Sequence, residues 1–288
     1  MTREYQKIKQ LPKEQETMPY THIRSIAALG SSYAAGPGIK PVADRRAYRS
    51  ARNYPHLLAE RLGATLTDLT VSGATTDTII DTPQRLLLQT FPPQLNGLPA
   101  DADLVTITAG GNDLGYIGSM VLLGTAGRLS SRALTRPLAT ALKRRGVPHP
   151  AEDDIDRAAA NLSRVVEETR RRAKHARVLL VDYLTVIGPD TRSSRETPFD
   201  EATLEEFRRL GDQVAEVFAR TATRTGAELV TVGKRSREHA LGSAEPWVTG
   251  LPERLRGSAL TGAFHPTGAG MRAVADAIAE HLKGPGLA

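Results

Sequence analysis

Four residues of this sequence have side chains or backbone groups that could act together on a carbonyl carbon. Ser32 lies in GSSYAAGPG, residues 30–38, and a serine hydroxyl becomes a nucleophile when a neighbouring base removes its proton. His265, in ALTGAFHPTGAGM, could be that base, because an imidazole exchanges protons near neutral pH. Gly73 and Asn112 could supply a backbone N–H and a side-chain amide to the oxyanion that the attack creates.

Each of these residues also has an ordinary structural interpretation. Ser32 could cap a helix, Gly73 could form a turn, and Asn112 could belong to an Asn-Asp turn. For the serine loop alone we favour the structural interpretation at roughly two to one. The loop is not the G-x-S-x-G elbow of α/β-hydrolases, because Ala34 occupies the place of the second glycine. His265 is one of seven histidines and by itself is a weak signal.

Short β-like runs alternate with helical patterns along the chain. The strand candidates are residues 23–29, 65–71, 103–109, 177–187 and 227–232, and the helix candidates are 54–63, 154–173, 203–226 and 270–282. This alternation predicts a three-layer α/β/α sandwich with a mostly parallel five-stranded sheet. Ligands of such sheets bind beyond the carboxyl ends of the strands. Ser32, Gly73 and Asn112 each follow one of the first three strand candidates, at that edge.

The sequence predicts one domain over residues 21–288, preceded by a flexible tail over residues 1–20. Residues 114–150 are less regular and predict either a lid or an inserted helical pair. Together with the loop 243–260 they are expected to form the walls of a pocket. Trp247 in that loop is a candidate pocket residue, although we favour a place in the core, because tryptophan is most often used for packing.

Composition excludes several kinds of chemistry. The chain has no cysteine, which excludes disulfides and thiol catalysis, and its histidines lack metal-ligand spacing, so we expect no metal and no cofactor. The net charge is +6, and the run RRRAKHAR is interpreted as a solvated helix end rather than a nucleic-acid site. An acidic carrier protein is left open as a partner. The sequence has no apolar run long enough for a membrane span and no apolar leader, which favours a cytoplasmic location.

Taken together and in order, the four motifs resemble those of the SGNH hydrolases, also called the GDSL esterase/lipase family. GSSYAAG is similar to the family's G-D-S-x-x-x-G block, SGATT to its glycine block, GGND to G-x-N-D, and FHP to the end of D-x-x-H-P. The resemblance extends from about residue 24 to residue 283. It implies a flavodoxin-like fold and an ester hydrolase with Ser32 as nucleophile and His265 as general base. The implied oxyanion hole consists of the N–H groups of Ser32 and Gly73 and the side chain of Asn112.

Two positions depart from the family pattern. Ser31 replaces the aspartate of the first block, and Gly262 replaces the aspartate that orients the histidine. Three alternatives follow for His265: the carbonyl of Gly262 accepts from Nδ1, a carboxylate such as Glu245 reaches the ring, or the protein is inactive. We favour the first, because a carbonyl can satisfy the same orienting hydrogen bond as a carboxylate.

The expected activity is hydrolysis of a small-molecule carboxylic ester through an acyl-serine intermediate. Two other functions are kept open: an acyltransferase that uses the same intermediate, and a non-catalytic binding protein on the same scaffold. Besides Trp247, the candidate pocket residues are Ser31, Tyr33 and Asp113.

Overall fold

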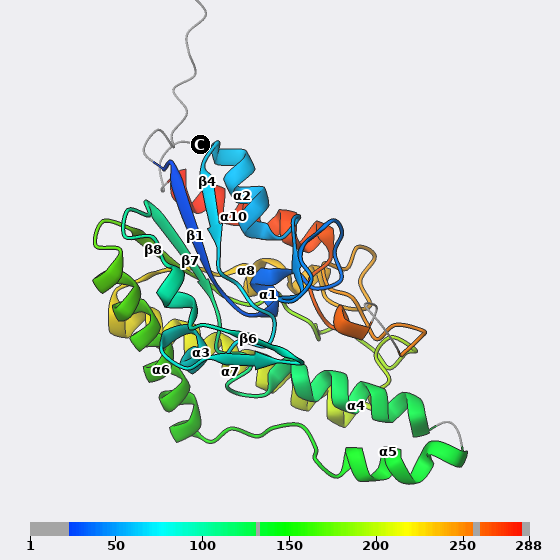
Figure 1. Cartoon of the computed structure of the whole chain (residues 1–288). Helices are drawn as coiled ribbons and strands as arrows, with labels where there is room; N and C mark the ends of the chain where they lie inside the picture. Colours follow the sequence, from blue (N-terminus) through cyan, green and yellow to red (C-terminus); the bar gives the residue numbers. More distant parts are fainter. Residues whose placement is uncertain (1–22, 131–132, 256–259, 284–288) are drawn as a thin grey trace, which may run out of the picture.

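The computed structural model describes residues 23–130, 133–255 and 260–283, and a five-stranded sheet lies at its centre (Figure 1). All neighbouring strands of this sheet run parallel. In order across the sheet they are β4 (Thr65–Asp68), β1 (Ser25–Gly30), β7 (Leu104–Thr108), β8 (Arg177–Val181) and β9 (Glu228–Val230). The predicted five-stranded parallel sheet is confirmed, although β8 ends at Val181 rather than at residue 187.

The order in which successive strands are added to the sheet reverses between β1 and β7. From β1 it proceeds to β4 on one side, and it then crosses back to β7 on the other side of β1. Ile26, Leu29, Leu104 and Ile107 of these two central strands are fully buried, as expected for strands covered on both faces. A crevice for ligands forms at such a reversal, beyond the carboxyl ends of the two strands. The candidate residues that follow β1 and β7 therefore lie next to each other.

Helices cover both faces of the sheet, which makes the predicted three layers. On one face α2 (Tyr54–Leu62) packs against α10 (Gly268–Lys283), and on the other α6 (Glu152–Arg172) packs against α7 (Glu201–Thr225) (Figure 1). The four helices coincide with the four helical patterns of the sequence within a few residues. Short helical segments complete the layers: α1 (Ser32–Ala35), α3 (Thr76–Ile80), η1 (Gln94–Gly97), α8 (Val232–Arg235) and η3 (Arg237–His239).

The irregular region 114–150 forms a helical pair, one of its two predicted forms. Its elements are α4 (Tyr116–Ser130), η2 (Ala133–Thr135) and α5 (Arg136–Lys143), and α4 and α5 pack together at the lower edge of the view in Figure 1. Two small hairpins were not predicted: β2 (Val42–Asp44) with β3 (Arg49–Ser50), and β5 (Gln84–Leu86) with β6 (Gln89–Phe91). The predicted tail 1–20 lies outside the described residues.

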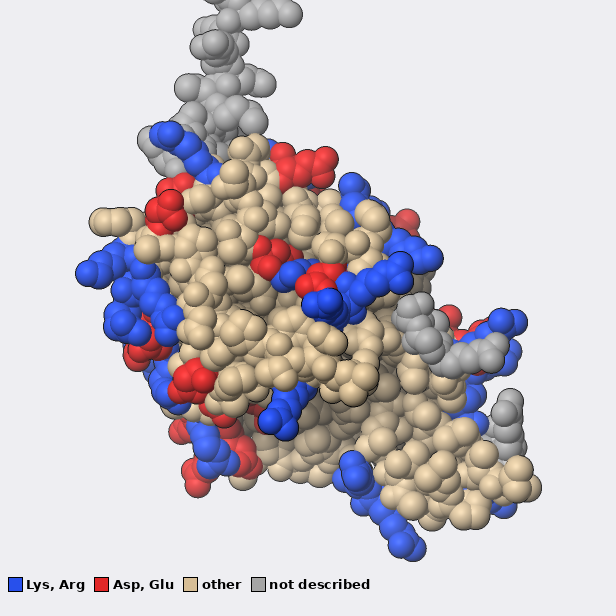
Figure 2. Space-filling model, in the orientation of Figure 1, with Lys and Arg blue, Asp and Glu red and all other residues tan. Residues whose placement is uncertain are grey.

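The cationic residues do not form one continuous patch on the face shown in Figure 2, where Lys and Arg are mixed with Asp and Glu and separated by other residues. At the basic end of α6, Arg170 donates to the carbonyl of Thr225 and Arg171 pairs with Glu168. Among the helices of the described ranges, none has the length and apolarity needed to cross a bilayer.

Candidate active site

The loop that carries Ser32 leaves the sheet at a point that only glycine can occupy. Gly30 ends β1 with a φ of +146°, and a Cβ added there would lie 2.4 Å from the carbonyl oxygen of Thr108 on β7. The buried amide of Gln94 holds this glycine from both sides: Nε2 donates to its carbonyl at 2.9 Å, and Oε1 accepts from its N–H at 2.8 Å. Ser32 follows as the first residue of α1, with 7% of its surface exposed. A first helical residue has no intrahelical partner for its N–H.

Ser31, which stands in place of the family aspartate, connects the serine loop to another strand end. Its Oγ lies 2.9 Å from the hydroxyl oxygen of Tyr183, just beyond β8, and both groups are buried. The same hydroxyl accepts from the N–H of Gly111, at 3.3 Å, in the loop after β7. Tyr183 therefore ties together the loops that carry Ser32 and Asn112. Sequence reasoning missed this tyrosine, because VDYLTV resembles an ordinary continuation of the strand.

Gly73 and Asn112 lie in loops that are bonded to each other. Gly73 has a φ of +82°, a left-handed conformation that favours glycine, and the Asn112 side chain donates to the carbonyl of Ala74 at 2.8 Å. The carboxylate of the next residue, Asp113, accepts from the backbone N–H of Thr76 at 3.2 Å, at the start of α3. Burial raises the pKa of Asp113, although the hydrogen bonds from Thr76 oppose this shift. Asp113 thus holds the Gly73 loop against the Asn112 loop.

The imidazole of His265 is held by a main-chain carbonyl, but not by the one predicted. Nδ1 lies 2.7 Å from the carbonyl oxygen of Ala263, which can only accept, so Nδ1 carries the proton and Nε2 presents a lone pair. The prediction of Gly262 is wrong by one residue. The Gly262 carbonyl is already engaged by the hydroxyl of Thr249 and, at 3.1 Å, by the backbone N–H of His265.

The structure does not support the alternative in which a carboxylate such as Glu245 orients the His265 ring. Glu245 is exposed, and its main-chain carbonyl accepts from Nδ1 of another histidine, His239, at 2.9 Å. Among the described residues, no carboxylate contacts the His265 ring. Burial lowers the pKa of His265 to about 4, although the hydrogen bond to Ala263 opposes this shift. The imidazole is therefore neutral at pH 7.

Tyr33 joins the serine helix to the histidine loop. Its hydroxyl donates to the carbonyl of Phe264 at 2.8 Å, and its ring centroid lies 5.7 Å from that of His265. Phe264 has a φ of +59°, which is a strained conformation for a bulky residue. The tyrosine hydroxyl thus fixes the strained residue directly before His265, and it brings together two loops that lie at opposite ends of the sequence. Strain of this kind is concentrated at functional sites.

Two hollows border the site, and they differ in polarity. A hollow of about 770 Å³ lies on the histidine side; its wall contains apolar residues such as Ile39, Leu251 and Pro266, and also the charged residues Arg128, Arg195, Glu196 and Glu253. A hollow of about 590 Å³ lies on the asparagine side and is more polar, with Asn112 and Asp113 in its wall. Trp247 borders neither hollow: it stacks on His239 with ring centroids 3.9 Å apart and packs against the core, the placement that we favoured.

A parallel α/β sandwich with serine, glycine and asparagine at its carboxyl edge and histidine before the last helix defines the SGNH class of ester hydrolases. The chain belongs to the GDSL-like lipase/acylhydrolase family, whose model matches residues 28–273. Lipase 2 of Streptomyces coelicolor is 32% identical over 263 residues, which cover 86% of this chain and 82% of that protein. The resemblance seen in the sequence motifs is therefore confirmed, and the protein is an ester hydrolase by family.

Solved structures of two other Streptomyces enzymes share the fold. An extracellular lipase from Streptomyces rimosus has a TM-score of 0.66 and 24% identity, with 89% of this chain and 99% of that chain covered. A phospholipase A1 from Streptomyces albidoflavus has a TM-score of 0.65 and 20% identity, with coverages of 91% and 99%. These likenesses confirm the predicted fold class.

Proposed function

We propose that the protein hydrolyses carboxylic esters through an acyl-serine intermediate on Ser32, with His265 as the general base of a two-residue machinery. The observation that carries this proposal is the hydrogen bond from Nδ1 of His265 to the carbonyl of Ala263. It fixes the tautomer that leaves Nε2 free to accept a proton, which is the task that a carboxylate performs in a serine triad.

In the first half of the reaction, Nε2 of His265 takes the proton of Ser32 while Oγ attacks the ester carbonyl carbon. The bond between that carbon and the alkoxy oxygen then breaks, and Nε2 returns the proton to the departing alcohol. In the second half a water molecule replaces the serine in the same two steps and releases the carboxylic acid. Neutral imidazole is the form that each attack requires, and burial of His265 keeps the ring in that form.

The tetrahedral intermediates place a negative charge on the former carbonyl oxygen. The proposed donors to this oxygen are the N–H groups of Ser32 and Gly73 and the side-chain amide of Asn112. Bonds between the surrounding loops support such an arrangement: Asn112 is held by Ala74, beside Gly73, and Tyr183 connects the serine and asparagine loops. Donors fixed in advance need little reorganisation when the charge develops.

The hollow on the histidine side is the proposed site for the apolar part of the ester. Pro266, which follows the general base directly, and Ile39, a few residues beyond the nucleophile, both line this hollow. The volume of about 770 Å³ and the apolar residues of its wall suit a hydrocarbon or aromatic group.

The test is turnover of 4-nitrophenyl butyrate together with labelling by a fluorophosphonate probe. We expect the folded protein to hydrolyse the ester and to be labelled, and Ser32→Ala to lose both properties. Ser119→Ala is the matched control, because its hydroxyl bonds only a carbonyl within α4. Turnover that persists in Ser32→Ala would contradict the nucleophile. A folded protein without labelling or turnover would support a binding protein instead.

A further inference from the structure

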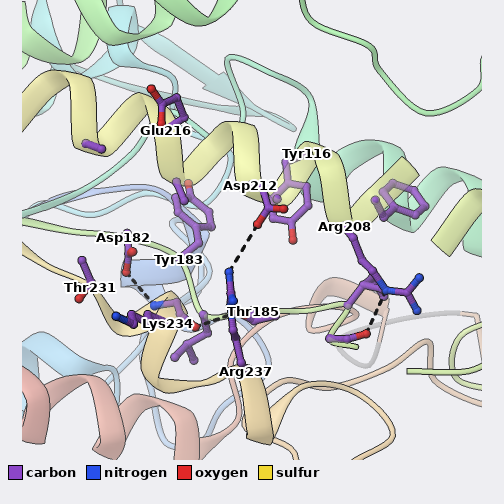
Figure 3. Close-up of a pocket in the computed structure, with 18 of the residues that line it drawn as sticks. Tyr116, Asp182, Tyr183, Thr185, Arg208, Asp212, Glu216, Thr231, Lys234 and Arg237 are labelled. Atoms are coloured by element: carbon purple, nitrogen blue, oxygen red, sulfur yellow. Dashed lines mark hydrogen bonds and ion pairs between the residues drawn. The ribbon is translucent and has the colours of Figure 1, made fainter. Parts of the chain in front are cut away.

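A third hollow, of about 550 Å³, lies beyond the ends of β8 and β9 and beneath α7 (Figure 3). We call it the α7 hollow. On the helix side the spacing of Gly211, Ala215 and Ala219 places three small residues in one row, which leaves room between the helix and the strand ends. Among the described residues in its wall, none is a proposed nucleophile, base or oxyanion donor. The hollow is therefore separate from the ester site.

The wall of the α7 hollow contains a buried carboxyl group. Asp182 follows β8, has 7% of its surface exposed, and accepts from the backbone N–H of Gly233 at 2.9 Å. Within the described part of the chain it forms no ion pair, whereas buried carboxylates in proteins are nearly always paired with a cation. Burial raises the pKa of Asp182 to about 7, so a large fraction is charged at neutral pH.

Among the described residues, the cationic side chains around the hollow form no ion pair with Asp182. Arg208 pairs with Glu201 and Glu205 at 3.0 Å each, and Arg237 faces Asp212 at 3.9 Å. Lys234 is exposed at the rim and forms no ion pair with the carboxyl group (Figure 3). Among the described residues the charged form of Asp182 therefore has no cationic partner, which leaves it open to a cation from solution.

The wall of the α7 hollow also contains buried apolar and aromatic side chains, while Thr231 and Lys234 lie beside Asp182 (Figure 3). Tyr116, Tyr183 and Leu184 are all buried side chains that line the hollow, and Figure 3 shows Asp182 and Tyr183 across from Glu216 on α7. Aromatic faces attract cations, and a hollow of this size accepts a small organic molecule. The pairing of one buried carboxylate with aromatic walls is suited to an ammonium group on a compact apolar body.

We propose that the α7 hollow is a second binding site, which takes a small organic amine. The ammonium group pairs with Asp182, and the apolar body packs against Tyr183 and under the small residues of α7. This binding does not depend on ester hydrolysis. Tyr183 forms the wall between the two sites, since its hydroxyl bonds Ser31 beside the nucleophile.

The experiment is isothermal titration of the full chain with 2-phenylethylamine at pH 8, where Asp182 is charged. Its matched probe is 3-phenylpropanoate, which has a similar body and the opposite charge. We expect one saturable site for the amine and none for the anion. Ala215→Leu, which fills the hollow, and Asp182→Asn should each weaken binding at least about tenfold. Ala202→Leu, exposed on α7 away from the hollow, should bind as the parent does.

Three outcomes would overturn the proposal: equal binding of the two probes, amine binding unchanged in Ala215→Leu, or no saturation up to about 10 mM amine. If Asp182→Asn fails to fold, the filled hollow of Ala215→Leu still decides. The titration is repeated in Ser32→Ala, where the amine should bind unchanged. Because the readout is heat rather than turnover, failure of the proposed ester hydrolysis would leave this result intact.

Discussion

His265 and Asp182 are both buried ionisable groups that are held by main-chain hydrogen bonds and, among the described residues, form no ion pair. His265 donates to the carbonyl of Ala263, and Asp182 accepts from the N–H of Gly233. Burial favours the neutral form of each, so it lowers the pKa of the histidine to about 4 and raises that of the aspartate to about 7. The same physical effect therefore moves the two groups in opposite directions.

The difference between the two regions lies in which form is present at neutral pH. At pH 7 the imidazole is neutral, which is the working form of a general base, and one carbonyl satisfies its single N–H donor. The carboxyl group is near the middle of its titration, and its charged form makes no ion pair within the described part of the chain. Burial thus keeps His265 in the neutral form that its proposed role requires. In contrast, the buried carboxylate of Asp182 lacks an ion-pair partner among the described residues, and the proposed cationic ligand would supply one.

The largest expected effect comes from removing the imidazole. His265→Ala should lower kcat/KM for 4-nitrophenyl butyrate by about 10⁴-fold or more, because the serine hydroxyl then loses its base. His175→Ala, which removes an exposed imidazole in the turn after α6, is the control and should change little. Residual activity above about a tenth of the parent would mean that another group takes the proton.

A smaller effect is expected where the two regions meet. Tyr183→Phe keeps the ring but removes the hydroxyl that bonds Ser31 and Gly111, so we expect kcat to fall about three- to tenfold with little change in KM. Tyr54→Phe is the matched control, because its buried hydroxyl bonds threonines of β7 instead. If both variants lose only stability and keep the parent kcat, Tyr183 has no positioning role.

Asp182→Asn should stabilise the protein at high pH. The folded-state pKa of about 7 exceeds the usual 3.8, so stability from the neutral carboxyl is present at low pH and is lost as pH rises toward 7. Asparagine is neutral throughout and its oxygen can still accept from Gly233. We expect the Tm to rise by roughly 4–8 °C at pH 8 and by much less at pH 4.5, as measured by calorimetry. Equal shifts at both pH values would contradict the assignment.

The smallest expected effect is that of moderate acid on the catalytic site. His265 cannot accept a proton once it is protonated, so kcat/KM should fall only as pH approaches about 4. Between pH 8 and pH 5.5 we expect changes of less than about twofold for an uncharged ester. Initial rates in overlapping buffers measure this profile, and a midpoint near 6.5 would show that the ring titrates as if exposed.

The location in the cell and the binding partners stay predictions. The cytoplasmic location, the absence of a nucleic-acid partner and the open option of an acidic carrier protein all rest on charge and composition. The first described residue is Ile23, so the predicted tail over residues 1–20 also stays a prediction.

The sequence alone predicted the sheet, its flanking helices and the positions of the four motif residues. Buried parallel strands appear in the sequence as short apolar runs, and their carboxyl ends must meet at one edge of the sheet. The sequence therefore predicts where polar residues directly after those runs lie. Ser32, Gly73 and Asn112 lie at that edge as expected. The two hairpins escaped prediction because their strands are only two or three residues long and carry little periodicity.

What only the tertiary structure decided is which groups hold those motif residues. The choice of Ala263 over Gly262 depends on the left-handed turn at Phe264 and on Thr249, which occupies the Gly262 carbonyl from another loop. Gln94 and Tyr183 reach the site only because the sheet brings separate strand ends together, and neither has a distinguishing neighbour in sequence. Local periodicity depends only on residues that are close in sequence. Hydrogen bonds between distant loops, and the burial that shifts a pKa, form only when the chain has folded and packed.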